Sequence, residues 1–127
     1  MKYLTAEQVL FIHARLVSET GGSHGVRDLG LLESAVSRPR ATFEGKESYP
    51  DIFSKAAALM DSFNNHPFVD GNKRTGIALA AVFLHRNGWG LTPSADELEV
   101  MTLRVAIGDV PIDTLAHWLN SNSATMT

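Results

Sequence analysis

Apolar residues recur along this chain at the three- and four-residue spacing of amphipathic helices. In residues 5–19 the apolar positions fall on one arc of a helix, and Thr5 and Gln8 have the spacing of a capping box. Similar patterns predict further helices at about 28–37, 51–65, 72–87, 94–107 and 111–120, with capping residues at Asp28, Asp51 and Ser94. Strand patterns are weak throughout the chain. The sequence therefore predicts an all-α fold of about six helices.

The expected helix at 72–87 differs from the others because it is apolar around its whole circumference. Its segment TGIALAAVFL (75–84) contains no Asp, Glu, Lys or Arg, so we expect it to be the central, buried helix of a compact bundle. Gly45 and Pro50 stand among polar residues in 40–50, so we expect an exposed loop there. The polar segment 121–127 is expected to be a frayed tail. No linker or repeat divides the sequence, so residues 1–127 are expected to form a single domain.

Composition and charge narrow the range of functions. A net charge of −3 over 127 residues argues against broad adhesion to nucleic acid or membranes, so any anion site has to be local. The absence of cysteine excludes disulfides, thiol chemistry and cysteine-bound zinc. The apolar part of the N-terminal segment is too short for a signal peptide, and no stretch approaches the roughly 20 apolar residues that cross a bilayer. We therefore expect a cytoplasmic protein with no direct nucleic-acid or membrane partner.

The segment HPFVDGNKRTG (66–76) places two cations, Lys73 and Arg74, at the start of the expected buried helix. A helix N-terminus is the positive end of the helix dipole, where cations are disfavoured unless an anion lies in front of them. The first N–H groups of a helix have no intrahelical partner, and Gly71 lets several of them converge on a ligand that approaches the backbone. Gly71 and Asn72, together with the two cations, therefore predict a phosphate site, and two cations suggest a polyphosphate.

Two further residues of this segment are candidates for chemistry. Asp70 precedes the helix, where a carboxylate either caps the helix and balances the cations or holds a divalent metal that bridges phosphates. His66 stands just upstream, before Pro67, and histidine is the commonest general base near neutral pH. Phe68 is expected to anchor the loop in the core.

Several residues outside this segment are expected to have structural roles. His13 falls in the middle of the apolar arc of the first helix, as a hydrogen-bonded core histidine would. Arg27, Asp28 and Glu33 are expected to form salt bridges that brace the loop. Glu47 is expected at a solvated loop tip.

The motif HPFVDGNKRTG is similar to the signature of the Fic/Doc superfamily, and the segments GVRDLGLLESAVSRPRATFEG and YPDIFSKAAAL resemble its Doc (death-on-curing) branch. The resemblance covers most of the chain and implies a compact, all-α Fic-type helical bundle. It implies His66 as the base that deprotonates a substrate hydroxyl and Asp70 as a ligand of Mg²⁺. Gly71 and Asn72 would form the phosphate nest, and Arg74 would hold terminal phosphate oxygens.

The resemblance also implies two features that bind other proteins. A segment of a target protein would dock against a flap formed by Thr42, Phe43, Glu44, Gly45, Lys46 and Tyr49. Self-inhibited Fic proteins carry Ser or Thr followed four residues later by an inhibitory Glu, and no Ser or Thr of this sequence shows that spacing. Doc proteins resemble toxins with a separate antitoxin, so we expect a Phd-like antitoxin chain whose disordered tail folds as it docks in an apolar groove.

Two positions depart from the family members that transfer AMP. Those members usually have Gly at the position of Lys73 and a second Arg at the position of Ile77. The Doc branch shares the Asn-Lys-Arg pattern and resembles a kinase that presents the γ-phosphate of ATP to a threonine of elongation factor Tu, which arrests translation. The sequence therefore favours the toxin of a type II toxin–antitoxin system, an ATP- and Mg²⁺-dependent kinase in which Lys73 and Arg74 neutralise phosphate charge. Two alternatives remain: transfer of AMP or another nucleotidyl group to a protein hydroxyl, and a catalytically idle module that binds phosphate or a nucleotide.

Overall fold

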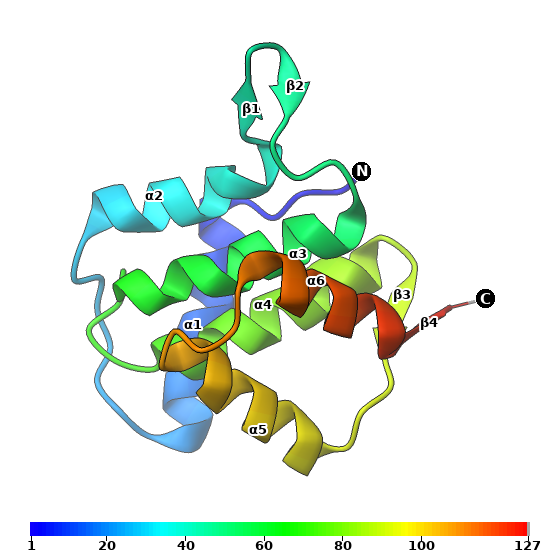
Figure 1. Ribbon diagram of the computed structural model, residues 1–127. Helices are drawn as coiled ribbons and strands as arrows, with labels where there is room; N and C mark the ends of the chain where they lie inside the picture. Colours follow the sequence, from blue (N-terminus) through cyan, green and yellow to red (C-terminus); the bar gives the residue numbers. More distant parts are fainter. Residues whose placement is uncertain (127) are drawn as a thin grey trace.

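Six α-helices carry the fold of residues 1–126, the part of the chain that the computed structural model describes (Figure 1). They are α1 (Ala6–Thr20), α2 (Leu29–Ser37), α3 (Ile52–Ser62), α4 (Asn72–Arg86), α5 (Ala95–Ala106) and α6 (Ile112–Ser121). Short 3-10 turns follow α2 and α3, as η1 (Arg38–Arg40) and η2 (Phe63–Asn65). The all-α, six-helix prediction is confirmed. Within residues 1–126, no helix combines the length and the apolar character needed to span a membrane.

Side-chain caps begin four of the helices where the sequence predicts them. Thr5, Asp51 and Ser94 each form a capping box, which satisfies backbone N–H groups that the helix leaves without a partner. Asp28 caps α2 by accepting a hydrogen bond of 3.0 Å from the Leu31 N–H. These caps fix where α1, α2, α3 and α5 begin, and therefore which of their faces meet the core.

The helices α3 and α4 pack against each other through the middle of the molecule (Figure 1). The helix α3 also packs on α6, and α1 packs on α4. Eight of the eleven residues of α3 are buried, against seven of the fifteen in α4. The helix α4 is central, as predicted, but it is less enclosed than its composition indicates, because Ile77, Ala78 and Ala81 are only half-buried and line a groove.

Two small antiparallel sheets correct the loop and tail predictions. Residues 40–50 contain a hairpin, β1 (Thr42–Phe43) and β2 (Lys46–Glu47), whose two turn residues have positive φ angles of 51° and 78°. That backbone is typical of a tight hairpin turn, which Glu-Gly does not signal as strongly as Asn-Gly does. The tail is ordered as β4 (Ser123–Thr125), which pairs with β3 (Trp89–Leu91); Thr127 lies outside the described residues. Backbone hydrogen bonds hold this polar tail, and side-chain patterns do not reveal them.

Candidate active site

The loop between η2 and α4 carries the motif and is tied to the segment before α2. The N–H groups of Arg27 and Asp28 donate to the Pro67 carbonyl at 2.8 and 3.0 Å, and the Val69 N–H donates to the Gly25 carbonyl at 3.0 Å. These bonds surround an antiparallel bridge between the two segments. Two loops far apart in the sequence therefore support each other beside the N-terminus of α4.

The side chain of Arg27 clamps the same loop from its outer side. Its Nε atom donates to the His66 carbonyl at 2.6 Å, and its Nη2 atom donates to the Asn65 carbonyl at 2.8 Å. The predicted salt bridges with Asp28 and Glu33 are wrong: among residues 1–126 Arg27 forms no ion pair, and Asp28 caps α2. Arg27 does brace the loop, as predicted, but through backbone carbonyls that a sequence pattern cannot display.

His13 and Phe68 anchor the loop to the protein core. Phe68 is buried, and its ring stacks on the ring of His13 with centroids 3.6 Å apart. The Nε2 atom of the buried His13 lies 2.8 Å from the Asp70 carbonyl oxygen, so it donates a hydrogen bond to that oxygen. The structural roles predicted for His13 and Phe68 are confirmed.

His66 is exposed and has a left-handed backbone conformation, with φ 56° and ψ 61°. A residue other than glycine in this region is strained, and such strain is concentrated at functional sites. The Nδ1 atom lies 3.4 Å from the amide Nδ2 of Asn72, a long separation at which the donor amide orients the ring only weakly. Hydrogen bonds of catalytic groups often shorten only when the substrate is bound.

Asn72 begins α4 with its side chain turned back into the loop. The side chain is buried, accepts a 3.0 Å bond from the Phe68 N–H and donates a 2.9 Å bond to the Phe68 carbonyl. Within residues 1–126, the backbone N–H groups of Asn72, Lys73 and Arg74 donate no hydrogen bond. These are the orphan donors of a helix N-terminus, and they are available to an anion. The N–H of Gly71 is already engaged by the Asp70 carboxylate at 2.8 Å, so Gly71 contributes its positive φ of 76° to the nest.

Asp70 is exposed and ionised. Hydrogen bonds from the Ser23 N–H and the Gly71 N–H lower its pKa, and the positive charge of Arg74 acts in the same direction. Each carboxylate oxygen accepts one of these bonds and keeps a free lone pair. No cluster of three metal-binding side chains occurs within residues 1–126. A single ionised carboxylate beside a phosphate nest fits Mg²⁺ in nucleotide sites, because that ion takes one or two carboxylates with phosphate oxygens and water.

The predicted chemical residues 66 and 70–74 all line one cavity of about 570 Å³. Both cations are exposed there, and Arg74 is steadied by a 3.0 Å hydrogen bond from its Nη1 atom to the Thr20 hydroxyl of α1. Ala106 and Ile107, at the end of α5, form an apolar wall that the sequence did not indicate. The predicted flap residues do not line this cavity. Their hairpin projects from the body near the start of α3, whereas His66 follows the end of that helix (Figure 1).

The fold and the site together define an all-α protein with a His-Pro-Phe loop and an anion nest at the start of a central helix. Residues 3–84 match the model of the Fic/DOC family. The chain is 48% identical over 99 residues to Toxin Doc of Mycolicibacterium smegmatis (strain ATCC 700084 / mc(2)155), which covers 76% of both proteins. It is 32% identical over 120 residues to Protein kinase doc of Escherichia phage P1, which covers 94% of both.

The chain belongs to the Fic/DOC family. This confirms the family resemblance drawn from residues 66–76 and from the segments upstream of them.

Proposed function

We propose that this protein is the toxin of a type II toxin–antitoxin system that transfers the γ-phosphoryl group of ATP to a hydroxyl side chain of a translation protein similar to elongation factor Tu. One observation carries the proposal: three N–H groups that donate no hydrogen bond within residues 1–126, and two cations that form no ion pair there, share one cavity with a carboxylate and a strained histidine. The names of the two relatives, a toxin and a protein kinase, support the same function.

The chemistry assigns each group a task. The N–H groups at the start of α4, with Lys73 and Arg74, would hold the phosphate chain and neutralise the charge that develops during transfer. His66 would accept the proton of the attacking hydroxyl as its oxygen bonds to the γ-phosphorus and the bond to the bridging oxygen breaks, which releases ADP. Asp70 would hold Mg²⁺, which when bound offsets negative charge on the phosphates.

One side of α4, which begins at the phosphate nest, favours transfer of the γ-phosphoryl group over nucleotidyl transfer. Lys73 and Ile77 lie on that side and line the same apolar groove. At the position where AMP-transferring members of the family have a second arginine, the groove therefore presents a hydrocarbon surface. The positive charge that can bind phosphate is instead concentrated at Lys73 and Arg74, in the first turn of the helix.

A catalytically idle binding module is disfavoured by the backbone of His66. A module that only captures phosphate needs the N–H groups and the cations, but it does not need a histidine in a strained conformation. The Arg27 clamp on the His66 carbonyl maintains that conformation.

The apolar groove suits the tail of a Phd-like antitoxin. It has a volume of about 560 Å³ and lies between α1, α4 and α5, with Leu16, Ala81 and Leu98 among its lining residues. Lys73 and Arg74 border both the groove and the nucleotide cavity. A helical tail in the groove would therefore reach the two cations that hold phosphate, and its carboxylates would compete with ATP there. A target in the translation machinery also implies a cytoplasmic location.

The first test is toxicity in bacterial cells that express the chain from an inducible promoter. We expect the chain to arrest growth, His66→Ala to abolish this arrest, and the matched control His85→Ala, an exposed histidine at the far end of α4, to retain it. Circular dichroism of the purified variants checks that both are folded. Growth arrest by a folded His66→Ala protein would contradict the catalytic assignment.

A further inference from the structure

Lys55 is buried in the core of this protein, with 1% of its surface exposed. It lies on α3, and its Nζ atom donates to the Pro39 carbonyl at 2.9 Å and to the Glu47 carboxylate at 2.7 Å. The ring of Tyr3 lies beneath the ammonium group at 5.9 Å. A buried charge is strongly disfavoured unless it is paired and hydrogen-bonded, so these partners have to stay in place. Glu47 is exposed, as predicted, with 50% of its side-chain surface accessible, but it is not merely solvated, because its carboxylate pairs with the buried Lys55.

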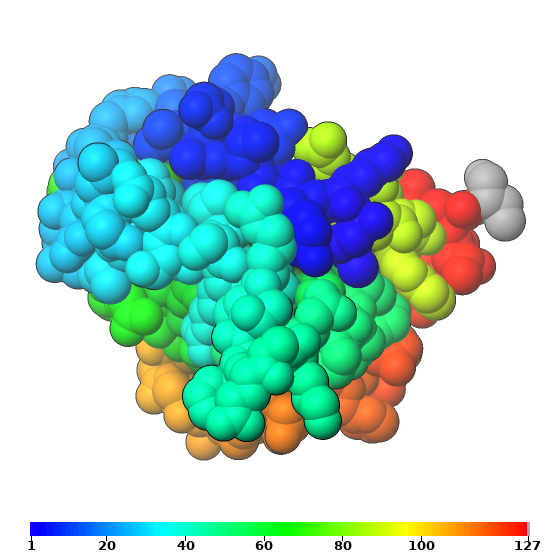
Figure 2. All heavy atoms as spheres, turned by 90° about the horizontal axis from the view of Figure 1, so that it is seen from above, coloured from blue at the N-terminus to red at the C-terminus, as the bar shows by residue number. Residues whose placement is uncertain are grey.

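The hairpin that contains Glu47 cannot hold its own position. Each of its strands has only two residues, and residues 42–47 are all exposed. Phe43 has 72% of its surface exposed, so the hairpin does not place its one large apolar side chain in the core. Figure 2 shows this segment standing out on the face seen from above, beside the N-terminal residues. An isolated two-stranded hairpin is at best marginally stable in water, so its order depends on contacts with the body.

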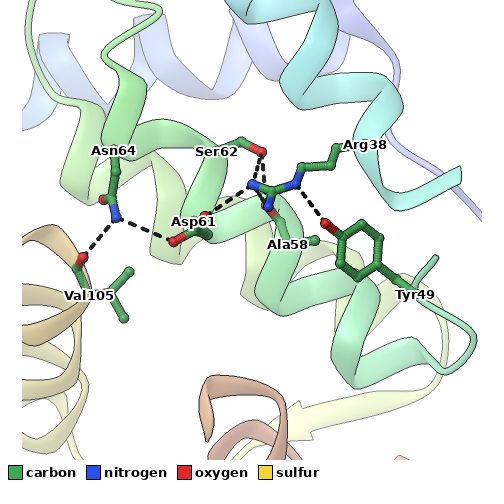
Figure 3. A network of polar contacts seen from close by, with 7 residues as sticks. All are labelled: Arg38, Tyr49, Ala58, Asp61, Ser62, Asn64 and Val105. Carbon is green, nitrogen blue, oxygen red and sulfur yellow. Dashed lines mark hydrogen bonds and ion pairs between the residues drawn. The ribbon is translucent and has the colours of Figure 1, made fainter. Parts of the chain in front are cut away.

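The two legs of the hairpin are joined to the body by two cations. Lys55 connects both legs, because Pro39 precedes β1 and Glu47 belongs to β2. Arg38 holds Tyr49, two residues after Glu47, through a 3.1 Å bond from Nε to the phenolic oxygen. Figure 3 shows that the guanidinium group of Arg38 lies between Tyr49 and the end of α3, where Asp61 and Ser62 accept further bonds.

We propose that Lys55 is a positioning residue that fixes the hairpin as a docking platform for the protein substrate. The proposal rests on the proposed function and on the family resemblance, which implies that this hairpin is the flap against which a target segment docks. Lys55 is remote from the nucleotide cavity and lines no part of it. It should therefore govern the affinity for the protein substrate and leave nucleotide binding unchanged.

Hydrogen–deuterium exchange of the purified protein tests whether Lys55 holds the hairpin, without any assumption about activity. In Lys55→Met, which keeps the volume of the side chain but removes its charge and donors, amides of residues 42–48 should exchange at least about tenfold faster, because hydrogen bonds to charged groups are strong. Amides of α4 should be unaffected. Glu47→Ala removes the half-exposed ion-pair partner and leaves the Lys55 ammonium with the Pro39 carbonyl, so it should have the same effect. Glu33→Ala on the exposed face of α2 should have none.

A double variant shows whether the two residues act as one pair. In Lys55→Met/Glu47→Ala the hairpin should exchange no faster than in either single variant, because the second change removes an interaction that is already lost. Additive effects, or unchanged exchange of residues 42–48 in both single variants, would overturn the proposal.

Steady-state transfer of labelled γ-phosphate to purified elongation factor Tu supplies the second readout. Both single variants should raise the KM for the protein substrate in inverse proportion to the fraction of molecules that keep the hairpin ordered, about tenfold where that fraction falls to a tenth. They should leave kcat and the KM for ATP within about twofold. An unchanged KM for the protein substrate would overturn the positioning role even if the hairpin is looser. If the unaltered protein transfers no label, the proposed function fails, and the exchange experiment alone then decides whether Lys55 holds the hairpin.

Discussion

Removal of the Arg27 side chain tests how the loop that carries His66 is held. Arg27→Ala removes two hydrogen bonds, of 2.6 and 2.8 Å, from a charged donor to the carbonyls of His66 and Asn65. Bonds of this kind contribute roughly 1.5–3 kcal/mol each. Arg27 is exposed, so water replaces part of each bond, and we expect a net loss of about 2 kcal/mol in the free energy of unfolding.

This loss can be converted into a melting temperature. Unfolding entropies of about 2.1 cal/mol/K per residue give roughly 0.27 kcal/mol/K for a chain of 127 residues. A loss of about 2 kcal/mol therefore lowers Tm by about 7 °C. The backbone bonds to the Pro67 carbonyl remain, so the loop should stay attached but hold His66 less accurately, and phosphoryl transfer should fall by up to about 100-fold.

Differential scanning calorimetry of Arg27→Ala, Arg27→Lys and the control Arg15→Ala measures the effect. Arg15 is exposed, pairs with Glu19 on the same helix and lies over the ring of Phe11 at 5.9 Å. Together these exposed contacts contribute about 1 kcal/mol or less, so removal of the Arg15 side chain should shift Tm by less than about 4 °C. Lysine cannot reproduce the fork of the guanidinium group, so Arg27→Lys should recover only part of the loss. A melting temperature and transfer rate for Arg27→Ala equal to those of Arg15→Ala would show that the Arg27 side chain does not hold the loop of His66.

Three further predictions follow from the same site. His66→Asn should abolish transfer yet raise the free energy of unfolding by roughly 0.5–1 kcal/mol in urea titrations, because asparagine tolerates the left-handed backbone better; a less stable variant would contradict the strain. Asp70 has a lowered pKa, so its ionised form stabilises the fold above the unfolded pKa near 4, and this contribution is lost as pH falls through the lower folded pKa. In urea titrations between about pH 2.5 and 6, Asp70→Asn should therefore lose less stability than the unaltered protein below about pH 4, and parallel curves would refute this role. Thr20→Val removes the acceptor that steadies Arg74, so calorimetric titration should show roughly three- to tenfold weaker ATP binding, and unchanged affinity would mean that Arg74 needs no support from α1.

The helices and the chemical residues of the site could be predicted because their signals are local. Capping residues and apolar spacing mark the helix starts within a few residues of sequence, and the structure has the caps at Thr5, Asp28, Asp51 and Ser94. The site residues from His66 to Arg74 lie in one short segment, so the turn into α4 is enough to bring them into one cavity.

The supports of the site could not be predicted because they depend on backbone atoms distant in sequence. Arg27 holds carbonyl groups 38 and 39 residues away, and carbonyl groups are identical in every residue. The sequence does not mark Lys55 as buried, because the burial of its charge follows only from the placement of Pro39 and Glu47. The hairpin and the β3–β4 pair are too short to leave an alternating pattern.

The most direct test of the central claim is a label-transfer assay with the purified protein, Mg²⁺, purified elongation factor Tu, and ATP labelled on either the α- or the γ-phosphate. His66→Ala and His85→Ala run in parallel. We expect label on elongation factor Tu from the γ-phosphate only, lost in His66→Ala and retained in His85→Ala. Label from the α-phosphate, or γ-label that persists in a folded His66→Ala variant, would contradict it.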